Sequence, residues 1–142
     1  MAELKYSKYI LKDTGGNNLQ TTLSAVRPAA LKGLKDWGGI QHRINWKYIS
    51  QPVLLEKEPH THDFDEFLCF LGPDPLNSSD FGAEIEFSLG QEGEKHIITA
   101  SSVICIPKGL IHCPLNFQKI NKPIVFCNVY LAPEYTRKPV TI

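Results

Sequence analysis

The most informative stretch of the sequence is residues 59–66, which read Pro-His-Thr-His-Asp-Phe-Asp-Glu. On an extended strand, residues two apart lie on the same face about 6–7 Å from each other, close enough for His60 and His62 to bind one metal ion. Glu66 has the same parity, but four residues of straight strand would carry it about 13 Å from His62. The chain must therefore bend between them. The two intervening aspartates favour a bend because their side chains hydrogen-bond to nearby backbone.

A second group of candidate residues lies in residues 107–116, Pro-Lys-Gly-Leu-Ile-His-Cys-Pro-Leu-Asn. The proline and glycine at its start predict a tight turn, which places His112 at the beginning of an apolar strand. Histidines two apart occur by chance in many chains, so His60 and His62 alone can also be explained as exposed polar residues. That explanation suits His112 less well, since His112 opens an apolar strand.

Together the two segments resemble the motifs of the cupin superfamily. The first cupin motif reads H-x-H, three or four residues, then E, and the second reads P-x-G, two residues, H, three residues, N. The positions that match at these spacings are His60, His62, Glu66, Pro107, Gly109, His112 and Asn116. The resemblance covers roughly residues 54–116. Within it, the opening glycine of each motif is replaced, by Leu54 and by Ser101, and Gly72 follows Glu66 one residue early.

The resemblance implies an all-β chain that forms a double-stranded β-helix, or jelly-roll, barrel with one divalent transition metal at its mouth. It also implies that the metal ligands are His60, His62, Glu66 and His112. Three neutral imidazoles and one carboxylate leave a divalent ion with one net positive charge and with open coordination positions. This set of nitrogen and oxygen donors suits iron, manganese, nickel, cobalt, copper or zinc.

Apart from the motifs, the sequence from Trp46 to Tyr130 alternates short β-like runs with turn signals, a pattern typical of a β-sandwich or barrel. We expect strands over residues 49–55, 67–71, 83–89, 96–99, 103–106, 112–117 and 124–131. Glycines in residues 89–95 and the Pro-Lys-Gly of residues 107–109 predict tight turns. Residues 72–82 form a long connector, which is either a surface loop or a lid.

The length of 142 residues favours one compact domain. We divide the chain into an N-terminal extension, residues 1–45, packed on a β-barrel domain, residues 46–142. Within the extension, residues 6–11 are apolar enough for a strand. Residues 28–36 predict a short helix, with proline near its first turn and two glycines just past its end.

The composition excludes several classes of partner. Fifteen lysines and arginines against fifteen aspartates and glutamates give zero formal charge, so the field that drives nucleic-acid binding is absent. No stretch approaches the roughly 20 apolar residues that cross a bilayer, and the first five residues open no signal peptide. We therefore expect a cytoplasmic protein without membrane contact. The four cysteines are widely spaced and form no C-x-x-C pair, so we expect reduced thiols.

Several residues near the motifs have alternative interpretations. Cys113 follows His112 with the opposite strand parity, so we expect its thiol to point away from the metal. His96 could act as a general acid or base beside the pocket, or be an ordinary strand histidine. Trp46 and Tyr48 could line the cavity, although aromatic residues on strands more often simply pack.

The function that these features favour is metal-dependent catalysis on a small polar organic molecule. The resemblance implies an oxygenase, an isomerase or a lyase. The alternative is a non-catalytic module or sensor that binds a metal or a small ligand. The partners that we expect are a small-molecule substrate or ligand and a second copy of the chain, in a homodimer. In that dimer we expect residues 6–11 to cover an otherwise unpaired sheet edge, either of their own chain or of the partner chain.

Overall fold

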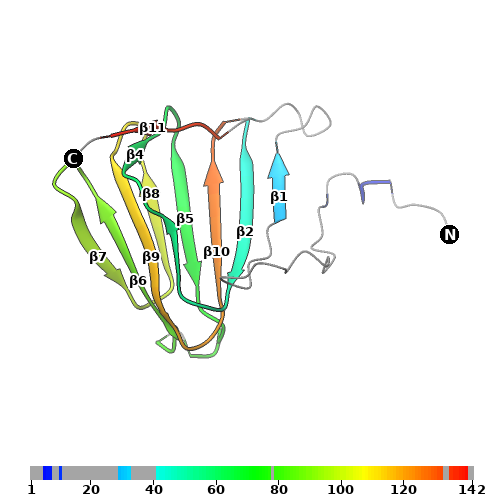
Figure 1. Cartoon of the computed structure of the whole chain (residues 1–142). Helices are drawn as coiled ribbons and strands as arrows, with labels where there is room; N and C mark the ends of the chain where they lie inside the picture. Colours follow the sequence, from blue (N-terminus) through cyan, green and yellow to red (C-terminus); the bar gives the residue numbers. More distant parts are fainter. Residues whose placement is uncertain are drawn as a thin grey trace.

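The computed structural model describes residues 5–7, 10, 29–32, 41–77, 79–132 and 135–140. In these residues the chain is built of β-strands joined by turns and loops (Figure 1). The strands are β1 Ala29–Lys32, β2 Arg43–Ile49, β3 Val53–Glu56, β4 His60–Thr61, β5 Glu66–Leu71, β6 Ala83–Leu89, β7 Glu94–Ile98, β8 Ser102–Ile106, β9 His112–Ile120, β10 Ile124–Tyr130 and β11 Lys138–Pro139. No helix in this part of the chain is long and apolar enough to cross a lipid bilayer.

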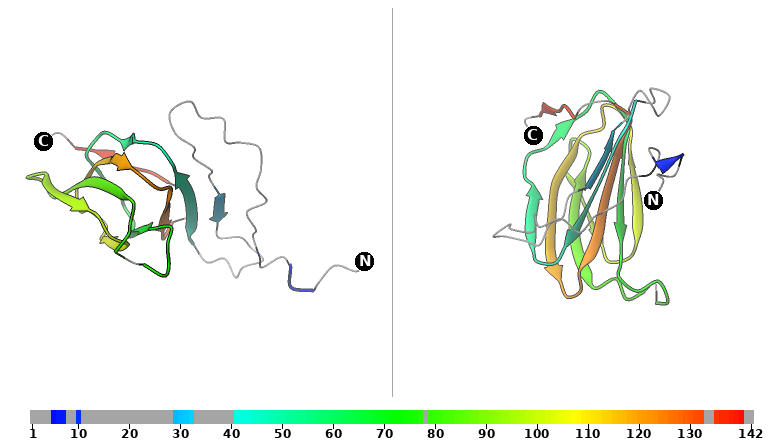
Figure 2. Two further views of the ribbon diagram at one scale, coloured as in Figure 1. Left: turned by 90° about the horizontal axis from the view of Figure 1, so that it is seen from below. Right: turned by 90° about the vertical axis from the view of Figure 1, so that its right-hand side faces the viewer.

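The strands form two sheets. β1, β2, β10, β5 and β8 are hydrogen-bonded in that order in one sheet, and β11, β4, β9, β6 and β7 in the other, with β3 also paired to β9. All of these pairings are antiparallel. Successive strands such as β5 and β6 lie in opposite sheets, and Figure 2 shows the two-layered cross-section that results. The prediction of an all-β jelly-roll barrel is therefore confirmed.

An aromatic core packs between the sheets. Phe70 of β5, Phe117 of β9 and Phe126 of β10 are almost fully buried, and the centroids of their rings lie 5.1 Å to 6.1 Å apart. Glu66 faces inward on β5 as well, but it precedes Phe70 by four residues, about 13 Å along the strand. The aromatic core therefore leaves the end of the barrel near Glu66 available for a functional site.

Most of the expected strands are confirmed. β5 to β10 match six of the seven expected ranges, with ends that differ by no more than three residues. The seventh range, residues 49–55, is divided between β2 and β3, which lie in different sheets. Pro52 precedes β3, and proline cannot donate a ladder hydrogen bond, so the chain breaks there. β2 begins at Arg43 and so crosses the expected boundary at residue 45; the division into extension and barrel stays a prediction.

The prediction of a helix over residues 28–36 is wrong for residues 29–32, the part of this range that the structure describes. Residues 29–32 form β1, which pairs with β2 from Ala29 opposite Trp46 to Lys32 opposite Arg43. A helix of about nine residues is marginal on its own, whereas the edge of β2 presents unpaired backbone groups that a short strand satisfies. The tertiary hydrogen bonds therefore outweigh the local helix signals. Residues 33–36 lie outside the described residues.

The strand predicted over residues 6–11 is also not found in its described part. Residues 5–7 form a turn, and the N–H of Ile10 donates to the carbonyl of Ser7 at 3.0 Å. The side chains of Tyr6 and Ile10 are exposed. The strand that pairs with the edge of β2 is instead β1. The homodimer stays a prediction, which the mass of the protein in solution would test.

Candidate metal centre

Three strand ends carry the predicted ligands to one end of the barrel. His60 opens β4, Glu66 opens β5 and His112 opens β9. β4 and β9 are neighbours in the same sheet, and His60 and His112 are direct partners across them. His62 follows β4 immediately, just before the chain bends into β5.

Asp65 stabilises the bend between β4 and β5. Its Oδ1 accepts a hydrogen bond from the backbone N–H of Lys108 at 2.8 Å, and its carbonyl accepts one from the N–H of Leu131 at 3.1 Å. The carbonyl of His62 accepts a third from the N–H of Gly109 at 3.0 Å. Gly109 has a φ of +86°, which glycine adopts without a steric penalty. The predicted bend is therefore present, and it brings the start of β5 back toward the histidines.

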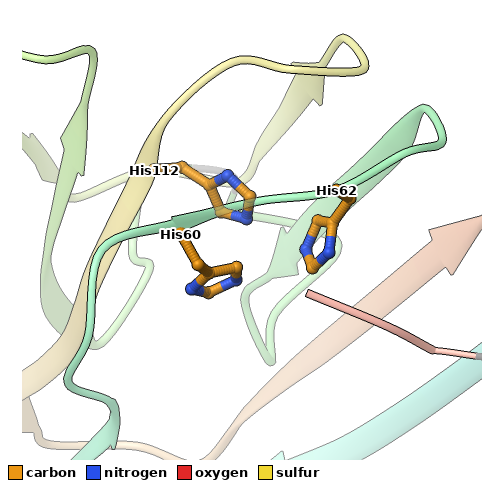
Figure 3. Close-up of side chains that lie close together, drawn as sticks. All are labelled: His60, His62 and His112. Atoms are coloured by element: carbon orange, nitrogen blue, oxygen red, sulfur yellow. The ribbon is translucent and has the colours of Figure 1, made fainter. Parts of the chain in front are cut away.

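Three imidazoles gather in the space that this bend encloses. His60, His62 and His112 each offer one ring nitrogen, and these nitrogens all lie within 4.8 Å of one another. Figure 3 shows the three rings turned toward a shared space. All three residues are no more than 3% exposed. The interpretation of His60 and His62 as exposed polar residues is therefore wrong.

Backbone carbonyls fix which ring nitrogen carries the proton. Nδ1 of His60 donates to the carbonyl of Glu58 at 2.7 Å, Nδ1 of His62 to that of Thr136 at 2.6 Å, and Nδ1 of His112 to that of Leu110 at 3.0 Å. In a neutral ring the other nitrogen, Nε2, then carries the lone pair that can bind a metal or accept a hydrogen bond. Burial lowers the pKa of His60 and lowers that of His112 to about 4, so both rings are neutral at neutral pH.

The carboxylate of Glu66 lies beside two of these rings. Its Oε1 is 3.4 Å from Nε2 of His62 and 3.6 Å from Nε2 of His112. Two ligand atoms that each lie about 2.1 Å from one ion are separated by about 3.0–3.4 Å at octahedral or tetrahedral angles. Nε2 of His62 is buried and has no hydrogen-bond partner, which is costly unless another group binds it. The donor set therefore fits a divalent transition metal.

A cavity of about 410 Å³ opens beside the histidines. Its lining comes from both sheets and from the segment that follows β10. The residues are Arg43, Asn45, Lys47, Leu55, Glu56, His60, Glu66, Leu68, His112, Cys113, Leu115, Phe126, Asn128, Tyr130 and Tyr135. The long connector at residues 72–82 contributes none of them. Among its described residues, then, nothing supports its interpretation as a lid.

Comparison with solved structures identifies the fold. No family model matches the chain, and no curated protein matches it. An uncharacterized protein with a double-stranded β-helix domain from Klebsiella pneumoniae matches at a TM-score of 0.52 and 10% identity, over 100% of this chain and 99% of the other. The chain has the double-stranded β-helix fold of the cupins.

Other structures with the cupin fold match comparably well. The polyketide cyclase RemF of Streptomyces resistomycificus matches at a TM-score of 0.53 and 12% identity, over 94% of this chain and 87% of that one. An oxalate oxidase in complex with glycolate matches at a TM-score of 0.52 and 13% identity, over 86% of this chain. This chain spans only 58% of that oxidase. Identities this low establish the fold and not the activity.

Cys113 lies on the cavity side of the cupin fold, so the expectation that its thiol points away is wrong. His112 pairs with Leu89 and Leu115 with Phe87, so three steps along β9 oppose two along β6. This extra residue is a β-bulge, which interrupts the alternation of faces. Cys113 itself has a φ of +80°. The side chain of Cys113 therefore does not follow the alternation of a regular strand.

We expect Cys113→Ala to leave metal affinity within about tenfold of the unchanged chain, a smaller loss than removal of a ligand would cause. The thiol lies outside the compact group of three histidine nitrogens, and burial raises its pKa, so it is protonated at neutral pH. Competition with a chelator measures this affinity. A loss as large as that of a ligand variant would instead assign Cys113 to the metal.

Sequence reasoning missed the contribution of the C-terminal segment to the site. β11 pairs with β4, placing Lys138 opposite Thr61, and this pairing holds the carbonyl that orients His62. Tyr135 lies at the cavity, with its hydroxyl 3.4 Å from Nε2 of His60 and its ring against His62, centroid to centroid 5.0 Å. Burial raises the pKa of Tyr135, so its hydroxyl stays protonated. No motif in the sequence marks this residue.

The polar face of β2 was missed as well. The cavity is lined by Arg43, Asn45 and Lys47, whereas Trp46 and Tyr48, the candidates suggested by the sequence, do not line it. Strict polar and apolar alternation in Arg-Ile-Asn-Trp-Lys-Tyr was the signal that could have identified this strand.

His96 is an ordinary strand histidine. It lies on β7, away from the cavity lining, with Nε2 2.6 Å from the Glu94 carboxylate and a side chain that is 45% exposed. It is therefore not an acid or base of the candidate site.

Proposed function

We propose that this chain binds one divalent transition metal through His60, His62, Glu66 and His112 and uses it to transform a small polar organic molecule. The observation that carries the proposal is the convergence of three buried imidazoles whose Nδ1 atoms are all bonded to backbone carbonyls. Such bonds to the second ring nitrogen are typical of metal-binding histidines, because they set the tautomer and the ring orientation.

Glu66 completes the proposed ligand set. Its carboxylate balances part of the charge of a divalent ion, and its 4% exposure keeps it from bulk water. An unpaired carboxylate buried to this degree is costly, and a bound cation would offset part of that cost. A divalent metal held here would supply Lewis acidity or, as iron, redox chemistry with dioxygen.

The remaining cavity residues support chemistry on a bound organic molecule. Leu68, Leu115 and Phe126 give the cavity apolar walls, while the Tyr135 hydroxyl lies within reach of whatever binds beside His60. This hydroxyl can donate a hydrogen bond to a substrate oxygen and hold its proton at neutral pH. Because a proton-bearing group lies next to the proposed metal site, we favour an oxygenase, isomerase or lyase over a non-catalytic binding module or sensor.

Metal analysis and substrate screening test this function. The full chain, purified under anaerobic conditions, is expected to carry one transition metal per chain by elemental analysis. The loaded protein is then incubated with a panel of small polar organic molecules, with and without air, and consumption is followed by NMR. Turnover only in air indicates an oxygenase, and turnover without air indicates an isomerase or lyase. Metal with no turnover would favour the binding module, and absence of metal after reconstitution would contradict the proposal.

A further inference from the structure

We propose that the inward face of β2 is an anion site. There Arg43 and Lys47, together with the amides of Asn45 and Asn128, bind a carboxylate group of the substrate. This inference rests on the proposed function, since it names the class of molecule that the metal site would act on. Strands of a β-sandwich usually turn apolar side chains inward and polar ones toward solvent. β2 does the reverse, because its polar residues line the cavity. Arg43, Asn45 and Lys47 alternate along this one face.

The pairing of β2 with β10 adds a second amide. Asn45 lies directly opposite Asn128, and both line the cavity. Side chains directly opposite each other on one face of an antiparallel pair have Cβ atoms about 4.5–5.5 Å apart. The two amides can therefore donate to one ligand group from neighbouring strands.

The same register sets the distance from this face to the metal ligands. Arg43 lies opposite Tyr130 on β10, and Tyr130 lies opposite Glu66 on β5. Two strand spacings, about 10 Å, therefore separate the backbone of Arg43 from that of Glu66. The side chains of both residues extend into the cavity between, so one small molecule can contact both.

Neither cation forms a close ion pair with a carboxylate of the described residues. Among the described residues, none forms an ion pair with Arg43 or Lys47 within 4 Å. Nε of Arg43 is buried and has no hydrogen-bond partner. Burial lowers the pKa of Lys47, an effect that Glu56 partly opposes. Both residues are only partly exposed, so a bound anion would offset part of the cost of holding two unpaired cations there.

The carboxylates of the cavity are already engaged. Glu56 is paired with Arg137, with Oε1 2.5 Å from Nη1, and Glu66 is proposed to bind the metal. The described charged groups that line the cavity are thus two cations and two carboxylates, and a divalent metal would add two positive charges. The loaded site therefore favours an anion.

A carboxylate suits this site better than a phosphate. The planar guanidinium of Arg43 matches the two oxygens of a carboxylate. A dianionic phosphate would bring a second negative charge toward Glu56 and Glu66, which line the same cavity. The volume of about 410 Å³ lies toward the lower end of the roughly 300–1,000 Å³ typical of ligand pockets. We therefore infer a small organic monocarboxylate.

Calorimetric titration of matched probes tests this inference. The binding affinity of the full chain is measured for three carboxylates, namely glycolate, pyruvate and benzoate, and for the neutral amide of each. Inorganic phosphate is titrated in the same way, and every titration is made with and without Zn²⁺. At least one carboxylate is expected to bind at least about tenfold more tightly than its amide, because a hydrogen bond to a charged group is roughly that strong. Zn²⁺ is expected to strengthen this binding.

Variants assign the effect to the residues of β2. Arg43→Gln and Lys47→Met are each expected to weaken carboxylate binding about 10- to 100-fold with unchanged zinc stoichiometry, and Arg43→Lys is expected to restore part of it. Lys119→Gln is the matched control. It removes an equally charged side chain that is 69% exposed and lies 3.6 Å from Glu84, and its affinity is expected to stay within about twofold.

Other results would overturn the inference. Equal affinity for carboxylates and amides would contradict the anion site. Carboxylate affinity that stays unchanged in both Arg43→Gln and Lys47→Met would contradict it as well. Tighter binding of phosphate would reject the carboxylate class. Failure of the metal proposal is separate: zinc would not bind, while the carboxylate preference would persist in the metal-free chain. Thermal unfolding of each variant identifies any that does not fold, and Arg43→Gln and Lys47→Met then serve as alternatives to each other.

Discussion

His112→Ala is expected to reduce the affinity for a divalent metal by at least about 100-fold. Changes to residues that only orient a metal ligand cost about 10- to 100-fold, and His112 would itself be a ligand. Its ring is 2% exposed and fixed by the Leu110 carbonyl, so the substitution removes a donor that is already oriented. Zinc titration against a chelator, at limiting metal, measures the loss.

The matched control for His112→Ala is His96→Ala. Both variants remove one imidazole from a strand, but His96 is exposed and does not line the cavity. Only the control is expected to keep the rise in melting temperature that zinc gives, since a ligand that binds only the folded state stabilises it. Full zinc occupancy of His112→Ala at limiting metal would show that the second motif does not supply a ligand.

Phe117→Ala is expected to lower the free energy of unfolding by about 3–5 kcal/mol, the usual cost of truncating a buried phenylalanine. Phe117 is fully buried, and its ring centroid lies 5.7 Å from that of Phe126 and 6.1 Å from that of Phe70. Domains are commonly stable by only about 5–15 kcal/mol, so this loss is a large fraction of the total. Urea unfolding followed by circular dichroism measures it.

The control for the core is Phe67→Ala. Phe67 lies on β5 next to the inward-facing Leu68, but it is on the opposite face of the strand and is only partly buried. Its truncation is expected to cost less than that of Phe117, because less apolar area is exposed to water. Equal losses for the two variants would contradict the placement of the core between the sheets.

The sequence predicted the parts of the site that depend on local geometry. His60 and His62 are two residues apart, and Asp65 stabilises the required bend by accepting a hydrogen bond from the backbone of Lys108. His112 follows a tight turn, as expected, and pairs directly with His60. These contacts follow from residue spacing and turn chemistry, which a single sequence displays.

The parts that the sequence did not predict depend on contacts between distant segments. Residues 29–32 became a strand because β2 offered an edge, against their local helix signals. The thiol of Cys113 turned into the cavity because β9 has a bulge, which the residue pattern does not reveal. Tyr135 reached the site because β11 pairs with β4, a contact between residues more than 70 positions apart.

The pairing of β11 with β4 also bears on how the protein would acquire its metal during biosynthesis. The carbonyl of Thr136 that orients His62 comes 24 residues after His112 in the chain. A ribosome that has just released His112 has therefore not yet released the segment that orients His62. Translation proceeds at about 5–20 residues per second, so this interval is of the order of seconds. The order of the chain thus favours metal uptake after the segment that contains Thr136 has been released.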